Sequence, residues 1–464
     1  MSSTLDTSTD LLRKLLSAGV QTSKSIAQTL DVSQPTVSRL LKSLGDEAIR
    51  ISIHGSIQYA LRDARRAGLE SSVSRITPEG RLQRLGQLVP VLPEGFALLS
   101  GQGADSYSEG LPWWLYDMRP QGYLGRAYAR QNARRLSLPL RLSDWSDTHV
   151  IQALQQSGDD LPGNLLMSEQ AEQRFINADL PQPVALADKL AGYVALAGAA
   201  EAGELPGSSA GGEQPKFTAY VQTGLPGDAA AGADADADRN AAHVIVKFSA
   251  AEDNAVSERW RDLLLAEHVA LSVLAESGVA AASSCVLDAG GQRFLEVQRF
   301  DRVGAMGRVA LLSLSALDAE FVGSGGSWHE VTQALIAQDC VVSLAAHGAA
   351  LLWAFGTLIG NTDKHNGNLS FTSDKGRPYQ LAPAYDMTPM GFAPHAGGGM
   401  NHQLSAPLIV PAISGDIWRA ALEMAQRYAQ QLAAEPRFSP RFAPCIEATQ
   451  AHLAAAQMRI DRLA

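Results

Sequence analysis

A polar stretch between two apolar runs is the feature that most limits how this chain can fold. Residues 351–355, LLWAF, lead into GNTDKHNGN at residues 360–368, and the chain becomes apolar again at Leu369 and Phe371. Buried polar groups cost stability unless each of them finds a partner. We therefore expect the carboxylate, imidazole and amides between these two core segments to form a site rather than to fill a core.

Composition indicates a multidomain globular chain. With 464 residues the chain is too long for one ordinary core, so two or three domains are expected. Its hydrophobic content of 46% and charged content of 19% exclude a disordered chain. No apolar run reaches the roughly 18 residues of a membrane span, and the N-terminus lacks a signal-peptide core. The three cysteines are widely spaced and lack metal-ligand spacing, which favours the reduced cytoplasm.

The first 68 residues are basic although the whole chain is acidic. They carry nine Lys or Arg against six Asp or Glu, whereas the chain has a net charge of −10. Apolar spacing predicts three helices, followed by a hairpin that turns at His54 and Gly55. This order is typical of a winged helix-turn-helix, here over residues 1–66, which binds DNA or serves only for dimerisation and packing. The exposed start of its recognition helix supplies the candidate DNA-binding residues Gln34, Thr36, Ser38 and Arg39.

The remaining sequence predicts a linker, a mixed α/β region and a helical region. Residues 67–86 are polar and predict a linker or an exposed connecting helix. Short apolar runs between Gly and Pro turns favour strands in residues 87–310. This region contains a Gly-rich loop at 207–216 and an Ala/Asp/Gly-rich flexible insertion at 223–242. Helical patterns dominate residues 311–464.

Groups suited to phosphoryl transfer follow one another along the chain in the order found in protein kinases. The loop GSSAGGEQPK offers backbone N–H groups that suit phosphate oxygens. Lys247 lies in an apolar strand, VIVKFS, where a lysine either reaches solvent or meets a fixed anion. Asp363 and Asn368 have the D-x-x-x-x-N spacing of a kinase catalytic loop, and Asp386 follows after a strand-like segment. Phosphoryl transfer needs a phosphate cradle, a cation, metal-binding oxygens and an oriented hydroxyl, and this ordered set supplies them.

These motifs resemble those of the HipA-like serine/threonine kinases of bacterial toxin–antitoxin systems, in the subgroup with a fused N-terminal winged helix. The likeness covers roughly residues 200–400 and is carried by SSAGGEQPK, VIVKFS, VQRFDR, GNTDKHNGNLSF and PAYDM. It implies a multidomain α+β chain, in which the winged helix-turn-helix precedes a two-lobed protein-kinase-like fold. The mixed α/β region would be the N-lobe and the helical region an all-α C-lobe.

The resemblance also implies roles for individual residues. Asp363 would be the catalytic base, and Asn368 and Asp386 would bind Mg²⁺. Ser209, or next to it Ser208, would be autophosphorylated, and that phosphate would add negative charge where the phosphates of ATP must bind. The candidate ATP-binding residues are Lys247, Gly211, Gly212, Lys216, Gln298, Arg299, Phe300 and His365. His365 either orients Asp363 or hydrogen-bonds nearby backbone, and we favour the second because a kinase base needs no imidazole partner.

The implied cofactors are ATP and Mg²⁺, and the implied substrate is a protein with a Ser or Thr hydroxyl. The family suggests translation factors such as aminoacyl-tRNA synthetases as substrates and an antitoxin as a partner. The winged helix predicts DNA as a further partner and a second copy of the chain, because winged-helix proteins often pair on palindromic sites. Two other functions stay open: a transcription regulator whose kinase-like part senses a ligand, and a metal-dependent nuclease. A ligand sensor has no need for the proton-handling Asp363, and a nuclease has no need for the Gly-rich loop and Lys247.

Overall fold

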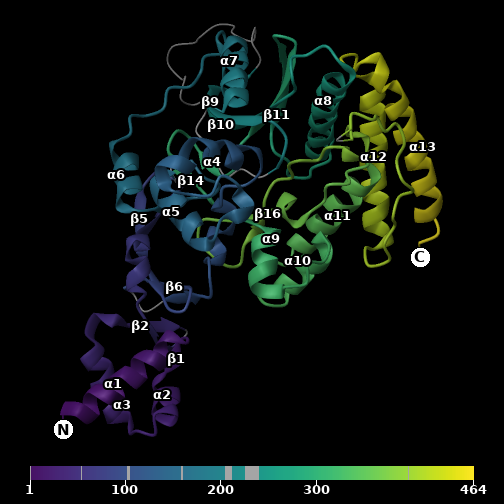
Figure 1. The fold of residues 1–464 in the computed structure, drawn as a ribbon. Helices are drawn as coiled ribbons and strands as arrows, with labels where there is room; N and C mark the ends of the chain where they lie inside the picture. Colours follow the sequence, from purple (N-terminus) through teal and green to yellow (C-terminus); the bar gives the residue numbers. More distant parts are fainter. Residues whose placement is uncertain are drawn as a thin grey trace.

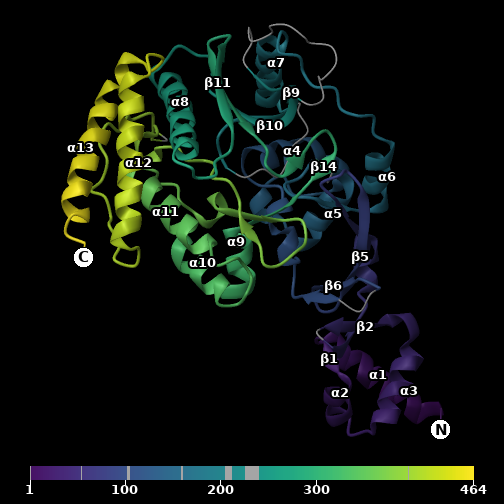
Figure 2. The same ribbon diagram turned by 180° about the vertical axis from the view of Figure 1, so that it is seen from behind.

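The computed structural model consists of a small N-terminal body at one end of the molecule and a larger part that contains the remaining elements (Figures 1 and 2). The structure describes residues 2–53, 55–101, 105–157, 160–203, 212–224, 240–395 and 397–463. None of the helices in these ranges is both long enough and apolar enough to cross a membrane.

The N-terminal body contains the predicted three helices and the predicted hairpin. Its elements are α1 (Ser2–Ser17), β1 (Gln21–Thr22), α2 (Ser23–Thr29), α3 (Gln34–Leu44), β2 (Ala48–Ile53) and β3 (Ser56–Leu61). The strands form an antiparallel sheet of order β1-β3-β2. Leu12, Ile26, Val37 and Leu40 are buried in its core, which α1, α2 and α3 share. Gly55 lies in the hairpin turn with a φ of 81°, a conformation that glycine adopts readily, and His54 lies outside the described residues.

Residues 67–86 do not form a linker. They contain β4 (Ser71–Ile76) and the first half of β5 (Leu82–Val91), which pair in a five-stranded sheet of order β7-β6-β5-β4-β8. The other strands are β6 (Gly95–Leu99), β7 (Ser106–Ser108) and β8 (Leu165–Met167). The linker prediction was wrong because serines that suggest a solvent-exposed segment are buried here. Ser74, for example, donates a hydrogen bond to Glu172 at 2.8 Å.

Helices from residues 122–177 pack around this sheet and complete a middle region of the chain. They are α4 (Gly122–Leu136), α5 (Asp147–Ser157) and α6 (Glu169–Asn177), preceded by a short 3-10 helix at Trp113–Met118. Ile151 and Leu154 of α5 share a buried core with Val73 of β4 and Leu88 of β5. The middle region therefore has a hydrophobic core of its own.

A second sheet carries the predicted strand lysine and has a helix on each face. Its order is β11-β12-β10-β9, and all pairs are antiparallel. The elements are α7 (Lys189–Ala202), β9 (Lys216–Gln222), β10 (Ala241–Phe248), α8 (Ala255–Glu276), β11 (Ser284–Ala289) and β12 (Gln292–Gln298). Phe294 packs toward α7 and the adjacent Leu295 toward α8, because successive side chains of a strand point to opposite faces.

The last part of the chain is mainly helical, as predicted, but it is not all-α. Its helices are α9 (Leu314–Leu317), α10 (Trp328–Ile336), α11 (Ala345–Leu358), α12 (Gly415–Ala434) and α13 (Ala443–Ile460). A three-stranded antiparallel sheet, β15 (Ala310–Ser313), β16 (Ser370–Ser373) and β17 (Gln380–Leu381), lies among them. The largest hydrophobic core joins these helices to α8, so the second sheet and the helical part are packed together.

Candidate active site

A cavity of about 360 Å³ lies between the second sheet and the polar loop that follows α11. Ile245 of β10 and Val297 of β12 line its sheet side, and Tyr116 and Asp117 of the middle region also line it. The predicted site residues that line the cavity are Gly212, Lys216, Lys247, Gln298, Arg299, Phe300, His365, Asn368 and Asp386. The candidates Ser208, Ser209 and Gly211 lie outside the described residues.

Lys247 lies at the centre of a buried ion-pair arrangement. Its Nζ donates hydrogen bonds to the two carboxylate oxygens of Glu267 on α8, at 2.7 and 2.8 Å, and also bonds to Asp386. Thr388 donates a further hydrogen bond to Glu267 at 2.7 Å. Burial lowers the pKa of Lys247, but Asp386 and Glu267 outweigh it and raise that pKa above its usual range. A charged ammonium is therefore fixed at the cavity wall.

Lys216 is the register partner of Lys247 on the neighbouring strand β9. Burial, with a second contribution from the charge of Lys247, lowers the pKa of Lys216 to about 8. Gly212 has a φ of 89°, and a Cβ at that position would lie 2.9 Å from the Nζ of Lys216. Glycine thus lets the backbone approach the lysine at the edge of the cavity.

The polar loop after α11 is held by its own amide side chains. Asn361 accepts a hydrogen bond from the backbone N–H of Asp363 at 2.9 Å, and Asn368 donates one to the carbonyl of Asp363 at 2.9 Å. Asp363 itself is half exposed beside the cavity, so a substrate can reach its carboxylate. Burial raises the pKa of Asp363 above its usual range, although the nearby His365 opposes the shift. A carboxylate with a raised pKa is a better proton acceptor.

His365 lies close both to nearby backbone and to Asp363, the two partners considered for it from the sequence. Its Nδ1 accepts a hydrogen bond from the backbone N–H of Gly367 at 3.0 Å, which is the backbone role that we favoured. Its Nε2 lies 3.9 Å from Oδ1 of Asp363, which is longer than a hydrogen bond but close enough for an ion pair.

Asp386 has the properties of a metal-binding carboxylate. Its φ is 56°, in the left-handed region that residues other than glycine rarely adopt and that is found at functional sites. Burial raises its pKa, but Lys247 and Lys216 outweigh this and hold the pKa below its usual range, so the group stays ionised. Among the described residues, no group of three or more His, Cys, Asp or Glu side chains is arranged to hold a metal ion. The donor set nevertheless fits Mg²⁺, which typically takes one or two carboxylates and completes its shell with waters and substrate phosphates.

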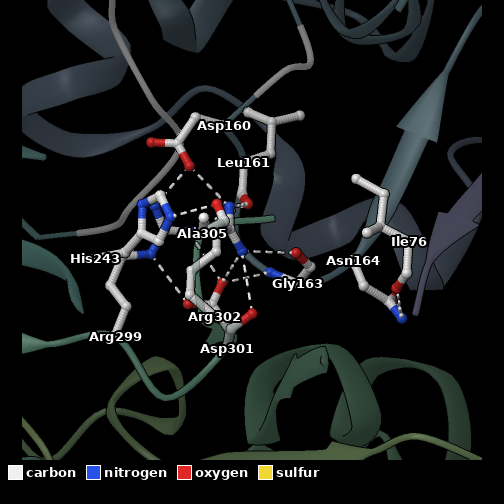
Figure 3. Close-up of polar contacts among 10 residues, drawn as sticks. All are labelled: Ile76, Asp160, Leu161, Gly163, Asn164, His243, Arg299, Asp301, Arg302 and Ala305. Carbon is white, nitrogen blue, oxygen red and sulfur yellow. Dashed lines mark hydrogen bonds and ion pairs between the residues drawn. The ribbon is translucent and has the colours of Figure 1, made fainter. Parts of the chain in front are cut away.

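Arg299 lines the cavity, and its side chain belongs to an Arg–Asp cluster in which Arg299, Asp301 and Arg302 are buried and Asp160 is half-exposed (Figure 3). Arg299 pairs with Asp160 at 2.7 Å and with Asp301 at 3.0 Å, and Arg302 pairs with the same two carboxylates at 2.8 Å each. Burial raises the pKa of Asp301, but the two guanidinium groups outweigh it and lower that pKa to about 2. Because Asp160 lies in the middle region, the cluster ties that region to the end of β12.

The segment after β12 also places an aromatic side chain in the cavity. Phe300 packs against Tyr385, with ring centroids 5.7 Å apart. Gln298, at the end of β12, is exposed. The three predicted ATP-binding residues of this segment thus all line the cavity, but the guanidinium of Arg299 is engaged in the Arg–Asp cluster.

Comparisons with known proteins place the chain in a family. A model described as "YjjJ-like toxin, middle domain" matches residues 67–176, and a model described as "HipA-like C-terminal domain" matches residues 208–452. Toxin YjjJ of Escherichia coli (strain K12) is 37% identical over 428 residues, which cover 92% of this chain and 93% of that protein. The chain belongs to the HipA-like toxin family.

Two solved structures are similar to this HipA-like chain. One is a chain of the Shewanella oneidensis MR-1 toxin–antitoxin complex of HipA, HipB and operator DNA, with 15% identity and a TM-score of 0.47 over 82% of this chain and 96% of that one. The other is the Helicobacter pylori proinflammatory kinase CtkA, with 14% identity and a TM-score of 0.34 over 47% of this chain and 86% of that one.

Several residues of the HipA-like site were missed in the sequence. Glu267 has a signal in retrospect, because it is a carboxylate inside the apolar run LLLAEHVAL. Tyr385 is half-buried, and its hydroxyl donates to the carbonyl of Gly367 at 2.8 Å. Asp117 of the middle region accepts hydrogen bonds from the N–H and hydroxyl of Ser313, both at 2.6 Å. Its contribution has no local signal, because Asp117 and Ser313 are far apart in the sequence.

The candidate DNA-binding residues lie far from the cavity, at the start of α3 in the N-terminal body (Figure 1). Gln34, Ser38 and Arg39 are exposed, and Thr36 is half-buried. Arg39 donates a hydrogen bond to the hydroxyl of Thr36 at 3.2 Å. These side chains therefore form one exposed polar surface, separate from the cavity.

Proposed function

We propose that this HipA-like chain is an ATP- and Mg²⁺-dependent serine/threonine protein kinase. The observation that carries the proposal is the meeting of Lys247, Glu267, Asn368 and Asp386 around one cavity. In protein kinases, a strand lysine paired with a helix glutamate holds the nucleotide, and an Asp and an Asn hold the metal ions. The same four chemical groups, drawn from β10, α8 and two loops, converge here.

The remaining residues have roles that follow from their positions. Lys247 and Lys216 would contact the phosphates of ATP, since both ammonium groups line the cavity. Asp386 and Asn368 would hold Mg²⁺, which when bound neutralises charge on the phosphates. Asp363 would orient the substrate hydroxyl and accept its proton, because its carboxylate is exposed beside the cavity. Asn361 and Asn368 would keep Asp363 in position through their hydrogen bonds to its backbone.

The biological role that we propose is a growth-arresting toxin with its own DNA-binding module. The relative Toxin YjjJ, which matches nearly the whole chain, supports the toxin role. Residues 2–61 have the element order of a winged helix-turn-helix, in which α3 would be the recognition helix. Residues 1–68 carry nine Lys or Arg against six Asp or Glu, and this positive balance would attract the phosphates of DNA in an otherwise acidic chain.

Intact mass after incubation with Mg²⁺·ATP tests the kinase proposal. We expect one added phosphate on the wild type, none on Asp363→Ala, and a reduced amount on Ser209→Ala. Asp374→Ala is a matched control, because Asp374 is an exposed carboxylate in the turn between β16 and β17 and should behave like the wild type. ATP binding without phosphorylation of freshly dephosphorylated protein would instead indicate a ligand sensor. Absence of ATP binding would favour a nuclease.

A further inference from the structure

A stretch of the middle region is strongly basic in a chain that is acidic overall. Between residues 119 and 141 the sequence contains six arginines and no Asp or Glu. The arginines are Arg119, Arg126, Arg130, Arg134, Arg135 and Arg141. Five of them are exposed, and those on α4 recur at a spacing of four residues, where like charges repel each other. This arrangement weakens the helix, so a function for the charges is expected.

Four of these arginines line a groove of about 750 Å³, which we call the arginine groove. They are Arg119, Arg126, Arg130 and Arg141. The groove is next to the cavity, because Gln121 lines both. The backbone joins the two walls at this point, where the N–H of Tyr123 donates to the carbonyl of Gly212 at 3.0 Å. A chain lying in the groove is therefore close to the entrance of the cavity.

One residue of the chain itself shows which group the groove accepts. Among the described residues that line the groove, Glu213 is the only acidic one, and its carboxylate pairs with Arg126 at 2.5 Å. Within the described part of the chain, Arg119, Arg130 and Arg141 form no ion pair. Guanidinium groups bind carboxylates with matched, paired hydrogen bonds. Three further guanidinium groups thus have no carboxylate partner among the described residues, although that of Arg119 stacks on the ring of Tyr116 and that of Arg130 donates to the carbonyl of Arg126.

The other lining residues favour a peptide over a nucleic acid. Leu140, which is 74% exposed, and Leu142 give the groove apolar contacts. Single-stranded nucleic acids are bound by free aromatic faces on which bases stack. Trp145, the aromatic residue among those that line the groove, is held in place, because its Nε1 donates to the carbonyl of Pro139 at 2.8 Å and its ring packs edge-on against Tyr128.

We propose that the arginine groove binds an acidic segment of the protein substrate beside the hydroxyl that is phosphorylated. This inference rests on the proposed kinase function and names its substrate class: a protein with several Asp or Glu residues near the target Ser or Thr. The occupied groove would hold the substrate, while the residues of the cavity perform the transfer.

Fluorescence anisotropy with labelled peptides tests this inference. The probes are a peptide with one Ser flanked by Glu residues and the same peptide with every Glu replaced by Gln. The groove variant is Arg130→Glu with Arg141→Glu, and the matched control is Arg134→Glu with Arg135→Glu. The control changes the charge by the same amount. Both of its residues lie on α4, are exposed and do not line the groove. Thermal unfolding of both variants checks that the fold is kept.

We expect the wild type to bind the Glu peptide about ten-fold more tightly than the Gln peptide, from two or three exposed ion pairs. The groove variant should lose this preference, and the control variant should keep it. Equal binding of the two peptides, or equal loss in both variants, would overturn the inference. Tighter binding of a single-stranded RNA oligonucleotide, lost in the groove variant, would also overturn it and assign the groove to nucleic acid.

The kinase proposal and this inference fail in different ways. Peptide binding is measured without ATP, and autophosphorylation is measured by mass on the same proteins. Autophosphorylation without a preference for the Glu peptide would overturn the groove inference alone. A preference for the Glu peptide without any phosphorylation would overturn the kinase proposal and leave the groove as an acidic-peptide site.

Discussion

Replacing Glu267 with Gln tests whether the ion pair with Lys247 holds the cavity together. Glu267 is fully buried and accepts three hydrogen bonds, two from Lys247 and one from Thr388. Glutamine keeps the shape of the side chain, but its NH₂ group must face at least one of these donors. The buried group made of Lys216, Lys247, Glu267 and Asp386 would also change from a net charge of zero to +1.

The expected cost follows from what remains around the lysine. Removing one partner of a buried ion pair costs about 3 to 5 kcal/mol. Lys247 keeps its bond to Asp386, so we expect a loss of about 3 kcal/mol, at the lower end of that range. The larger part of the molecule spans about 400 residues, so at roughly 2.1 cal/mol/K of unfolding entropy per residue that loss lowers its Tm by about 4 °C.

The same substitution should reduce the rate of phosphorylation. Lys247 would then depend on Asp386 alone, which competes with the proposed role of Asp386 at the metal. We expect autophosphorylation to slow about a hundred-fold, the effect of misplacing one group at a catalytic centre. Single-turnover intact-mass kinetics with saturating Mg²⁺·ATP measure this rate.

Glu276→Gln is the control for both measurements, because Glu276 lies on the same helix but is exposed. A Tm and a rate for Glu267→Gln that match those of this control would refute the reasoning about the pair. A lower Tm with a normal rate would show that the pair stabilises the fold and has no part in catalysis.

Three further outcomes are expected. Since the pKa of Lys216 is lowered to about 8 from a usual 10.5, the unfolded chain binds more protons than the folded chain between these values. The free energy of unfolding should therefore rise across this window while ATP affinity falls, as measured by urea and nucleotide titrations. Lys216→Met should abolish the trend in ATP affinity and reduce the rise in the free energy of unfolding, to which Lys364 also contributes because burial lowers its pKa to about 8. Asp301→Ala should lower the free energy of unfolding by about 3 to 5 kcal/mol, measured with urea, because it leaves the buried Arg299 and Arg302 with only Asp160 as a partner. A loss below about 1 kcal/mol would contradict a stabilising role for the Arg–Asp cluster. Arg39→Ala should weaken binding of duplex DNA and reduce its salt slope by about 1, whereas an unchanged slope in anisotropy titrations would exclude a phosphate contact.

Much of the candidate site could be predicted because its residues lie in short motifs. Asp363 and Asn368 belong to one loop, and Lys247 lies in a strand whose apolar neighbours identify it. Glu267 could not be placed in this way, since its pairing with Lys247 depends on how α8 packs against the second sheet. The position of the Arg299 side chain likewise depends on Asp160 of the middle region.

The fold was predictable where apolar spacing is regular and less so elsewhere. The helices of the N-terminal body and the helix α8 follow a clear pattern. The strand β4 does not, because its buried serines read as surface residues until their partners are known. The strand β15 is short and pairs with β16, which is distant in sequence, so no local pattern indicates it.

The middle region limits how far the cavity can open, and so affects how small molecules enter and leave it. It is attached to one wall through the Arg–Asp cluster at the end of β12, and to the other through the bonds of Asp117 to Ser313. Moving these walls apart would break one of two sets of partly buried hydrogen bonds. Because the middle region holds both walls, wide opening of the cavity should be slow. Small molecules should then enter and leave without separation of the walls, on the side of the cavity where Gln121 lies. Their rates of entry and exit should therefore change more with substitutions near Gln121 than with substitutions in the second sheet.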